Sequence, residues 1–235
     1  MSILKEGLQA RIDAVRERMT TAAERVGRSP TEVRLLAVSK TFPANAVEAA
    51  IEAGLSAFGE NYAHEGCDKV DALRASHPDA HLEWHFIGPL QSNKTRGVAE
   101  RFDWVQSVDR ERIALRLAEQ RPADLPPLNV LLQVNISDED SKSGVVPSEV
   151  SKLAAVVAMQ PRLRLRGLMA IPEPATDPEQ QREPLARMRA LFERLRAEGY
   201  DIDTLSMGMS TDLDAAIAEG ATLVRVGTAI FGGRS

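Results

Sequence analysis

The 235-residue sequence contains a single cysteine, Cys67, and this scarcity restricts both the compartment and the kinds of site that the chain can form. One cysteine cannot form a disulfide within the chain, and it cannot supply the several thiolates of a typical structural zinc site. A cysteine-poor chain of this kind is expected in a reducing compartment. We therefore expect a cytoplasmic protein.

Long apolar runs and basic blocks are also missing. No stretch approaches the roughly 18 consecutive apolar residues of a membrane span, and the first 19 residues mix charged and apolar side chains unlike a signal or transit peptide. Asp and Glu (34) outnumber Lys and Arg (29), which gives a net charge of −5. Without a basic surface to attract phosphate backbones, we expect neither a nucleic-acid partner nor a membrane partner.

The residues that are present indicate a folded α/β protein. Apolar side chains recur every three or four positions over residues 2–27, which predicts an amphipathic helix that Gly27 and Pro30 terminate. Beyond it, short runs of Val, Ile and Leu alternate with helical segments, as in βα units whose strands are covered on both faces. The eight strand-like runs are residues 35–40, 57–61, 83–88, 104–109, 130–135, 166–171, 204–210 and 223–231.

Eight βα repeats in a chain of this length predict a single (β/α)8 TIM barrel. Residues 1–235 would then form one domain, in which the helix of residues 1–27 packs on the barrel as an extra element. An open, doubly wound sheet is the alternative. The barrel reading has a functional consequence, because TIM barrels place their active sites at the C-terminal ends of the strands. Helices are expected between the strands, among them residues 43–53, 109–119, 147–159 and 180–198.

Lys40 is one of only six lysines, and it alone ends a strongly apolar run. Burial lowers the pKa of a lysine, and the neutral amine can then attack a carbonyl carbon to form a Schiff base. The alternative is a lysine that reaches solvent from a strand end or pairs with Glu60.

Two segments near the C-terminus could bind an anion at the same end of the barrel. Residues 227–233, GTAIFGG, place small residues where TIM barrels commonly bind phosphate, although they do not form a Walker loop. Ser210 or Thr211 could cap the next helix, since Thr211 and Asp214 have capping-box spacing. Arg225 lies within an apolar run, so it needs either a carboxylate or a ligand as partner.

A metal site is not expected. His81 and His85 are four residues apart, but the HExxH pattern is absent, and a strand through this segment would separate the two rings too far to share an ion.

Seven ordered motifs resemble one known family, the pyridoxal phosphate homeostasis protein family (YggS/PROSC). The resemblance runs from the first predicted strand to the C-terminus. The motifs are AVSKT (37–41), FGENYAHEG (58–66), EWHFIGPLQSNK (83–94), ISDEDSKSG (136–144), RGLMAIP (166–172), SMGMSTD (206–212) and VRVGTAIFG (224–232).

The resemblance implies a barrel similar to the N-terminal domain of alanine racemase (fold type III), with pyridoxal 5′-phosphate (PLP) bound as a covalent imine to Lys40. It further implies phosphate contacts and a set of residues around the pyridine ring. The phosphate residues would be Ser210, Gly227 and Thr228 with Ser206 nearby; Arg225 would approach the pyridine nitrogen, and Asn61, His85 and Met169 would line the ring.

The residues argue against catalytic turnover. A racemase needs bases on both faces of the substrate carbon, and Lys40 supplies one, while Tyr62 and Tyr200 are not placed to supply the second. An arginine at the pyridine nitrogen would also weaken the electron sink of the cofactor. We therefore expect a non-catalytic, monomeric PLP-binding protein that buffers PLP or delivers it to PLP-dependent apoenzymes through transient contacts.

Two enzyme alternatives remain open at this point: a PLP-dependent amino-acid racemase, and a Schiff-base aldolase that acts on a sugar phosphate without PLP. The polar linker that contains Lys142 is a further candidate, either as a mobile lid, as a secondary aldehyde acceptor, or as a merely solvated loop.

Overall fold

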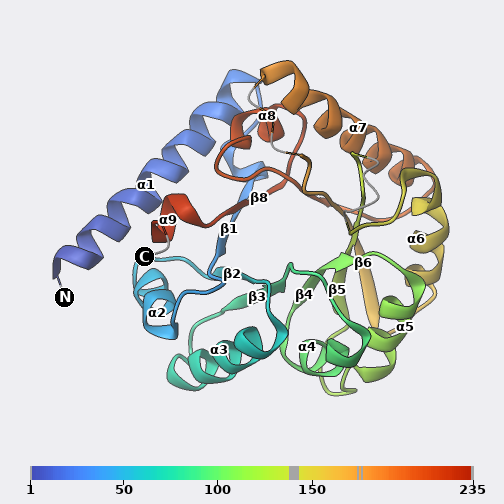
Figure 1. Ribbon diagram of the computed structural model, residues 1–235, viewed down its shortest axis with the longest axis horizontal. Helices are drawn as coiled ribbons and strands as arrows, with labels where there is room; N and C mark the ends of the chain where they lie inside the picture. The colour runs from blue at the N-terminus through green and yellow to red at the C-terminus, as the bar shows by residue number, and fades with distance from the viewer. Residues whose placement is uncertain (1, 138–142, 174, 176, 234–235) are drawn as a thin grey trace.

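The computed structural model describes residues 2–137, 143–173, 175 and 177–233. Eight parallel strands close into a barrel in chain order, which confirms the predicted TIM barrel and excludes the open sheet (Figure 1). The closing pair is β8 with β1, in register from Arg34 opposite Leu223 to Ala37 opposite Val226. The strands are β1 Arg34–Val38, β2 Ala57–Glu60, β3 Glu83–Phe86, β4 Trp104–Val108, β5 Leu128–Gln133, β6 Leu163–Met169, β7 Thr204–Ser206 and β8 Leu223–Val226.

The helices alternate with the strands and cover the outside of the barrel (Figure 1). They are α1 Ser2–Arg25, α2 Ala44–Glu52, α3 Ala63–Ser76, α4 Thr95–Arg101, α5 Glu111–Gln120, α6 Val150–Ala158, α7 Pro178–Ala197, α8 Leu213–Ala218 and α9 Thr228–Phe231, with short 3-10 turns at Pro30–Glu32, Ser92–Lys94 and Pro147–Glu149. Within the described ranges, no helix combines the length and the apolar character needed to cross a bilayer.

All eight strands end before their predicted last residue, and two of them end four or five residues early. The run 204–210 leaves the sheet after Ser206, because Gly208 adopts a φ of +94°, a conformation that turns the chain and suits glycine. The run 223–231 ends as a strand at Val226, and its last residues form the single turn α9. Apolar periodicity cannot separate a strand from a buried helical turn over so few residues.

Helix α1 packs along the outside of the barrel against α8 and α9, as Figure 1 shows. Its buried face repeats at helical spacing and includes Ile12, Val15 and Met19. This confirms the predicted amphipathic helix, which ends at Arg25, two residues before Gly27 with its φ of +70°.

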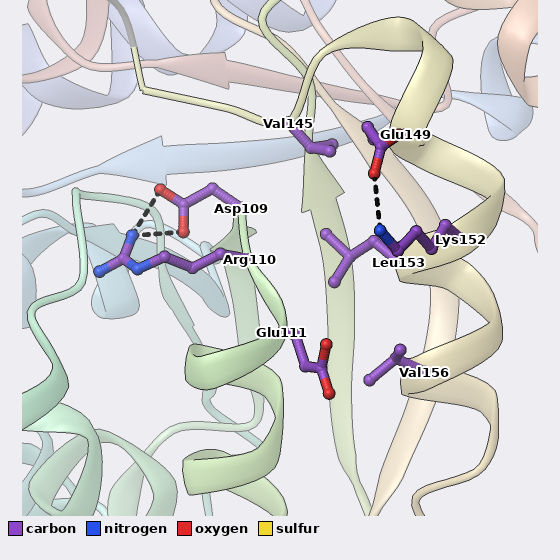
Figure 2. A pocket seen from close by; sticks show the side chains of 8 residues that line it. All are labelled: Asp109, Arg110, Glu111, Val145, Glu149, Lys152, Leu153 and Val156. Carbon is purple, nitrogen blue, oxygen red and sulfur yellow. Dashed lines mark hydrogen bonds and ion pairs between the residues drawn. The ribbon is translucent and has the colours of Figure 1, made fainter.

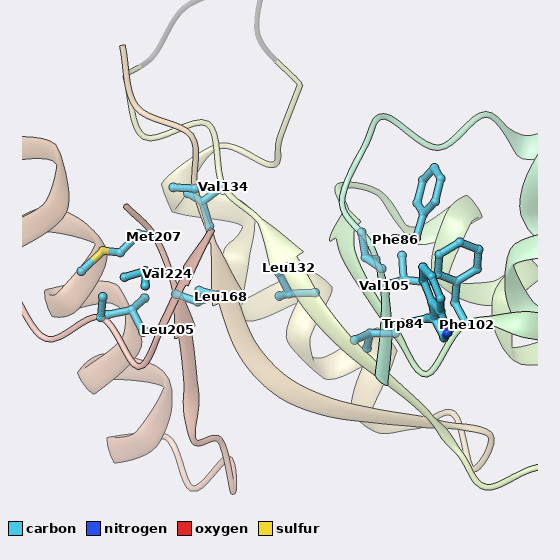
Figure 3. Close-up of a cluster of buried hydrophobic side chains, with 14 of the residues drawn as sticks. Trp84, Phe86, Phe102, Val105, Leu132, Val134, Leu168, Leu205, Met207 and Val224 are labelled. Carbon is cyan, nitrogen blue, oxygen red and sulfur yellow. The ribbon is translucent and has the colours of Figure 1, made fainter. Parts of the chain in front are cut away.

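The main hydrophobic core lies between the sheet and the helices. Figure 3 shows part of it, with Trp84, Phe86 and Phe102 gathered beside β3 and β4. The inside of the barrel is filled separately, because alternate side chains of a strand point to opposite faces. Two small apolar clusters lie there, Leu36 with Ala57, Ile87 and Leu223, and Trp104 with Leu131 and Met169.

Candidate functional site

The barrel brings the nine predicted site residues to the C-terminal half of its strands or to the loops that follow. Lys40 follows β1 and Asn61 follows β2, whereas His85 lies within β3 and Met169 ends β6. On the other side, Ser206 ends β7, Ser210 follows it, Arg225 lies in β8, Gly227 caps α9 and Thr228 begins it. Lys142, suggested above as part of a lid or as an aldehyde acceptor, lies outside the described residues.

Gly227 brings the last strand close to the first. A Cβ atom at Gly227 would lie 3.2 Å from the carbonyl oxygen of Val38, two residues before Lys40. Phe42 and Phe231 stack across the same junction with their ring centroids 5.0 Å apart. The loop that carries Lys40 and the turn of Gly227 and Thr228 are therefore neighbours, although they lie almost 190 residues apart in the sequence.

Glu60 interacts with a lysine that the sequence analysis did not single out. Its Oε1 atom accepts a hydrogen bond from Lys69 Nζ at 2.9 Å and from Ser39 Oγ at 2.6 Å. Both charged groups are buried, and burial raises the pKa of Glu60. The spacing of Glu65 and Lys69, four residues apart on α3, is the sequence signal that could have indicated this network.

Arg225 is buried inside the barrel, and both of its described hydrogen bonds go to uncharged oxygens. Nη1 donates to Ser206 Oγ at 2.6 Å, and Nη2 donates to the carbonyl oxygen of Ala170 at 2.7 Å. Burial lowers the pKa of the guanidinium to about 10, so it remains charged at neutral pH. The structural ion pair weighed as one explanation of Arg225 is not among these contacts; Asp212 acts on it only through its more distant charge.

A chain of hydrogen bonds continues from Arg225 across the interior of the barrel. Ser206 Oγ donates to Gln106 Oε1 at 2.7 Å, and Gln106 Nε2 donates to His85 Nδ1 at 2.8 Å. Because Nδ1 accepts, the proton of the neutral ring lies on Nε2, which donates to Glu83 at 2.7 Å. The direction of each of these hydrogen bonds is thus fixed. Gln106 was not recognised from the sequence.

The electrostatics of this chain match its hydrogen bonding. Burial lowers the pKa of His85, which favours the neutral ring. Burial alone would raise the pKa of Glu83, but its hydrogen bonds with His85 and Arg34 and the charge of Arg34 prevail and lower it to about 2. His85 also stacks on Trp104, with the ring centroids 5.0 Å apart. Its side chain is fully buried, and both ring nitrogens are engaged within the protein.

The predicted capping box at the start of α8 is wrong. The capping position is occupied by Asp212, which makes no side-chain cap; its Oδ1 accepts a hydrogen bond from the amide of Met209 at 2.7 Å instead. The chain must turn at Gly208, and an aspartate that bonds back to the backbone stabilises such a turn. The backbone of Ser210 is held from outside, because Arg18 of α1 donates to its carbonyl oxygen at 2.6 Å and pairs with Asp214.

Asn61 is held by close packing of its backbone. A Cβ atom on Gly88 would lie 2.1 Å from the carbonyl oxygen of Asn61, so only glycine fits there. The side-chain oxygen Oδ1 of Asn61 is buried and has no hydrogen-bond partner. Tyr62, the next residue, is 54% exposed.

A cavity of about 240 Å³ lies between α5 and α6 rather than at Lys40 (Figure 2). Four of its five charged lining residues are paired with each other: Lys152 contacts Glu149 at 3.2 Å, and Arg110 contacts Asp109 at 2.6 Å. Within the described residues, no three His, Cys, Asp or Glu side chains gather as a metal site would require.

The C-terminal ends of the strands and the loops that follow them form the rim of the barrel. The fold and this rim define a class of protein: a TIM barrel with a lysine after its first strand and a buried arginine in its last strand. The chain matches the family described as "Alanine racemase, N-terminal domain" over residues 11–235. It is 59% identical over 220 residues to the pyridoxal phosphate homeostasis protein of Escherichia coli K12, covering 94% of both chains. It is 57% identical over 223 residues to the protein of that name from Pseudomonas aeruginosa, covering 95% of this chain and 94% of the relative. The chain therefore belongs to the pyridoxal phosphate homeostasis protein family.

A solved structure supports the same grouping. PipY of Synechococcus elongatus PCC7942, determined with PLP bound, shares 32% identity with this chain. The TM-score is 0.79, and the match covers 96% of this chain and all of PipY.

Proposed function

We propose that this protein binds PLP as a Schiff base on Lys40 and takes part in PLP homeostasis by buffering or delivering the cofactor, without catalytic turnover. The observation that carries the proposal is Arg225, a buried cation whose described hydrogen bonds all go to uncharged oxygens. Such a group favours an anionic or electron-rich ligand beside it. The names of the relatives and the PLP bound in PipY support the same ligand.

The residues at the rim fit the chemical groups of PLP. When bound, PLP supplies an aldehyde: its carbon forms a C=N bond with an amine, and its oxygen is released as a water molecule. Lys40 would provide that amine. The hydroxyl groups of Ser210 and Thr228 and the amide of Gly227 would hold the phosphate, with Ser206 close by. At Gly227 the absence of a side chain leaves room beside Val38.

The remaining proposed residues would surround the ring. Arg225 would donate a hydrogen bond to the pyridine nitrogen and keep it unprotonated, because a guanidinium has protons to donate and no lone pair to accept with. Asn61 has a buried amide oxygen without a partner, and it would face one edge of the ring. Met169 would provide apolar contact with the ring of PLP. His85 would line the ring without a hydrogen bond to it, since both nitrogens of the His85 side chain are already bonded within the protein.

The same residues support binding without turnover. Racemisation requires a second base opposite Lys40, and neither tyrosine of the chain is a good candidate: Tyr62 is mostly exposed, and Tyr200 precedes β7 at the other end of the barrel. An unprotonated pyridine nitrogen further weakens the stabilisation of a carbanion. We propose that residues 1–235 act as one monomeric PLP-binding domain that meets PLP-dependent apoenzymes transiently.

The test is the visible absorption spectrum of the purified protein, before and after addition of PLP. The wild type should show an absorption band above 400 nm that borohydride removes, and peptide mapping should place the reduced adduct on Lys40. Lys40→Ala should lose both, while Lys152→Ala, a change at an exposed lysine, should retain them. A wild type that stays colourless in excess PLP would refute PLP binding. Racemisation or transamination that depends on Lys40 would refute the absence of turnover.

A further inference from the structure

A network of charged side chains, most of it buried, bonds to the backbone of the loop that carries Lys40. We propose that Lys69, Glu60 and Glu65 are positioning residues that fix the backbone on both sides of Lys40, so that its amine is held ready for the aldehyde. This inference rests on the proposed function and assigns a role to three side chains that do not themselves contact the ligand. It is carried by hydrogen bonds, burial and one strained residue.

Lys69 uses all three of its ammonium protons within this network. Its Nζ atom donates to the backbone carbonyl of Ser39 at 2.8 Å, to Glu60 Oε1 at 2.9 Å and to Glu65 Oε1 at 2.7 Å. The side chain is only 7% exposed. A lysine is rarely buried unless it is paired, and here the pairing is complete. The bond to Ser39 fixes the residue just before Lys40.

The residue just after Lys40 is fixed by the same network. Glu65 Oε1 accepts a hydrogen bond from the backbone amide of Thr41 at 2.6 Å. Thr41 has a φ of +67°, and it is the only non-glycine residue with positive φ in the part of the chain that the structure describes. A β-branched residue strongly disfavours this conformation, so the surrounding contacts must hold it there.

The bonds to the backbone of Ser39 and Thr41 give a reason for burying charged groups at this position, although their desolvation costs free energy. Glu60 is fully buried, and its Oε2 atom has no hydrogen-bond partner. A barrel could fill this volume with apolar side chains more cheaply, because buried ion pairs recover little more than the cost of their desolvation. What the charges provide here is a fixed position for the backbone of residues 39–41. Such a position lowers the entropic cost of forming a bond at Lys40.

The inference separates formation of the Schiff base from binding of the rest of the ligand. Pyridoxine 5′-phosphate has the same ring and phosphate as PLP but an alcohol in place of the aldehyde, so it cannot form the bond to Lys40. Lys69→Met should weaken the binding of PLP by about tenfold, within the range that small misplacements of reacting groups produce. It should leave the affinity for pyridoxine 5′-phosphate unchanged.

Two further variants extend the test. Glu65→Ala removes the acceptor of the Thr41 amide at a partly exposed side chain, so it folds even if Lys69→Met does not, and it should weaken PLP in the same selective way. Thr41→Gly removes the cost of positive φ, so adding it to Lys69→Met should restore part of the lost PLP affinity. Lys152→Met serves as the control, because Lys152 lies on the surface of α6 and pairs only with Glu149 among the described residues.

Affinities for both ligands and the rate of adduct formation, trapped with borohydride, would be measured on the wild type and on each variant. Selective loss of PLP binding with rescue by Thr41→Gly supports the inference. An equal loss of affinity for both ligands, or no change in either affinity, overturns the inference. The network would then stabilise the fold in general, or have no effect on the site, rather than position Lys40. If the wild type itself forms no adduct with PLP, the proposed function fails instead.

Discussion

The hydrogen-bond chain inside the barrel can be tested at Ser206, the residue that joins Arg225 to Gln106. Its hydroxyl oxygen accepts from Arg225 Nη1 at 2.6 Å, while its proton goes to Gln106 Oε1 at 2.7 Å. Ser206→Ala removes both bonds at once. Strand β4, which also carries Gln106, offers a matched control in Ser107, which is similarly buried but whose hydroxyl has no hydrogen-bond partner.

The magnitude follows from the groups that each change leaves behind. Ser206→Ala leaves a buried guanidinium donor and a buried amide oxygen without a hydrogen-bond partner. Each unsatisfied group destabilises the folded state by about 1–3 kcal/mol, so we expect the free energy of unfolding to fall by about 3 kcal/mol. For a chain of this size that lowers Tm by roughly 6–12 °C. Ser107→Ala removes a hydroxyl that is already unsatisfied, so it should be neutral or stabilise the protein by about 1 kcal/mol.

The assay is urea denaturation of the ligand-free protein, monitored by circular dichroism, with the thermal midpoint as a second measurement. The slope of the transition should be the same in both variants, because neither change alters the surface exposed on unfolding. If Ser206→Ala and Ser107→Ala shift the midpoint equally, the directed chain from Arg225 to Gln106 contributes nothing specific, and the reasoning is wrong.

Three further predictions concern acid stability, packing and the phosphate side of the site. Glu83→Gln should lower the free energy of unfolding at neutral pH, and this loss should shrink as the pH falls from about 5 towards 2. The reason is that the folded-state pKa of Glu83 is lowered to about 2, so the stability that its charge contributes is present above its ordinary pKa and is lost on acidification. Urea titrations of both proteins across this pH range measure the difference. Gly88→Ala should lower the free energy of unfolding by about 1–3 kcal/mol and displace Asn61, whose carbonyl oxygen would lie 2.1 Å from the new Cβ. Arg18→Met should weaken PLP and pyridoxine 5′-phosphate alike, by roughly three- to tenfold or about 1 kcal/mol, when binding is measured by titration, because Arg18 holds the Ser210 loop rather than Lys40.

Each of these has its own control. For Glu83→Gln, a difference from the wild type that is constant with pH would contradict the lowered pKa. Gly233→Ala adds a Cβ with no atom within 4 Å and should change nothing, so equal losses at both glycines would refute the steric argument. Arg16→Met removes a bond from the same helix to Gly54, away from the proposed site, and should leave both affinities intact.

Much of the fold could be predicted because the barrel repeats one local pattern eight times. Each strand is covered on both faces, so each appears as a short apolar run, and eight such runs in sequence indicated the closed barrel. Strand ends were less certain where a short apolar run turns into a helical turn, as at Thr228–Phe231. The cap of α8 was misassigned because the spacing of Thr211 and Asp214 does not reveal that Asp212 bonds to the turn at Gly208.

The sequence by itself determined the chemistry available at the rim, since a lysine at the end of one apolar run and an arginine inside another could be recognised without coordinates. Only the tertiary structure decided what these groups contact. Lys69 reaches the loop of Lys40 because α3 packs beside β2, and Gln106 links His85 to Ser206 because β4 faces β7 across the interior. Such contacts join residues up to 100 positions apart, and local periodicity carries no information about them because barrel closure alone sets which inward-facing side chains meet.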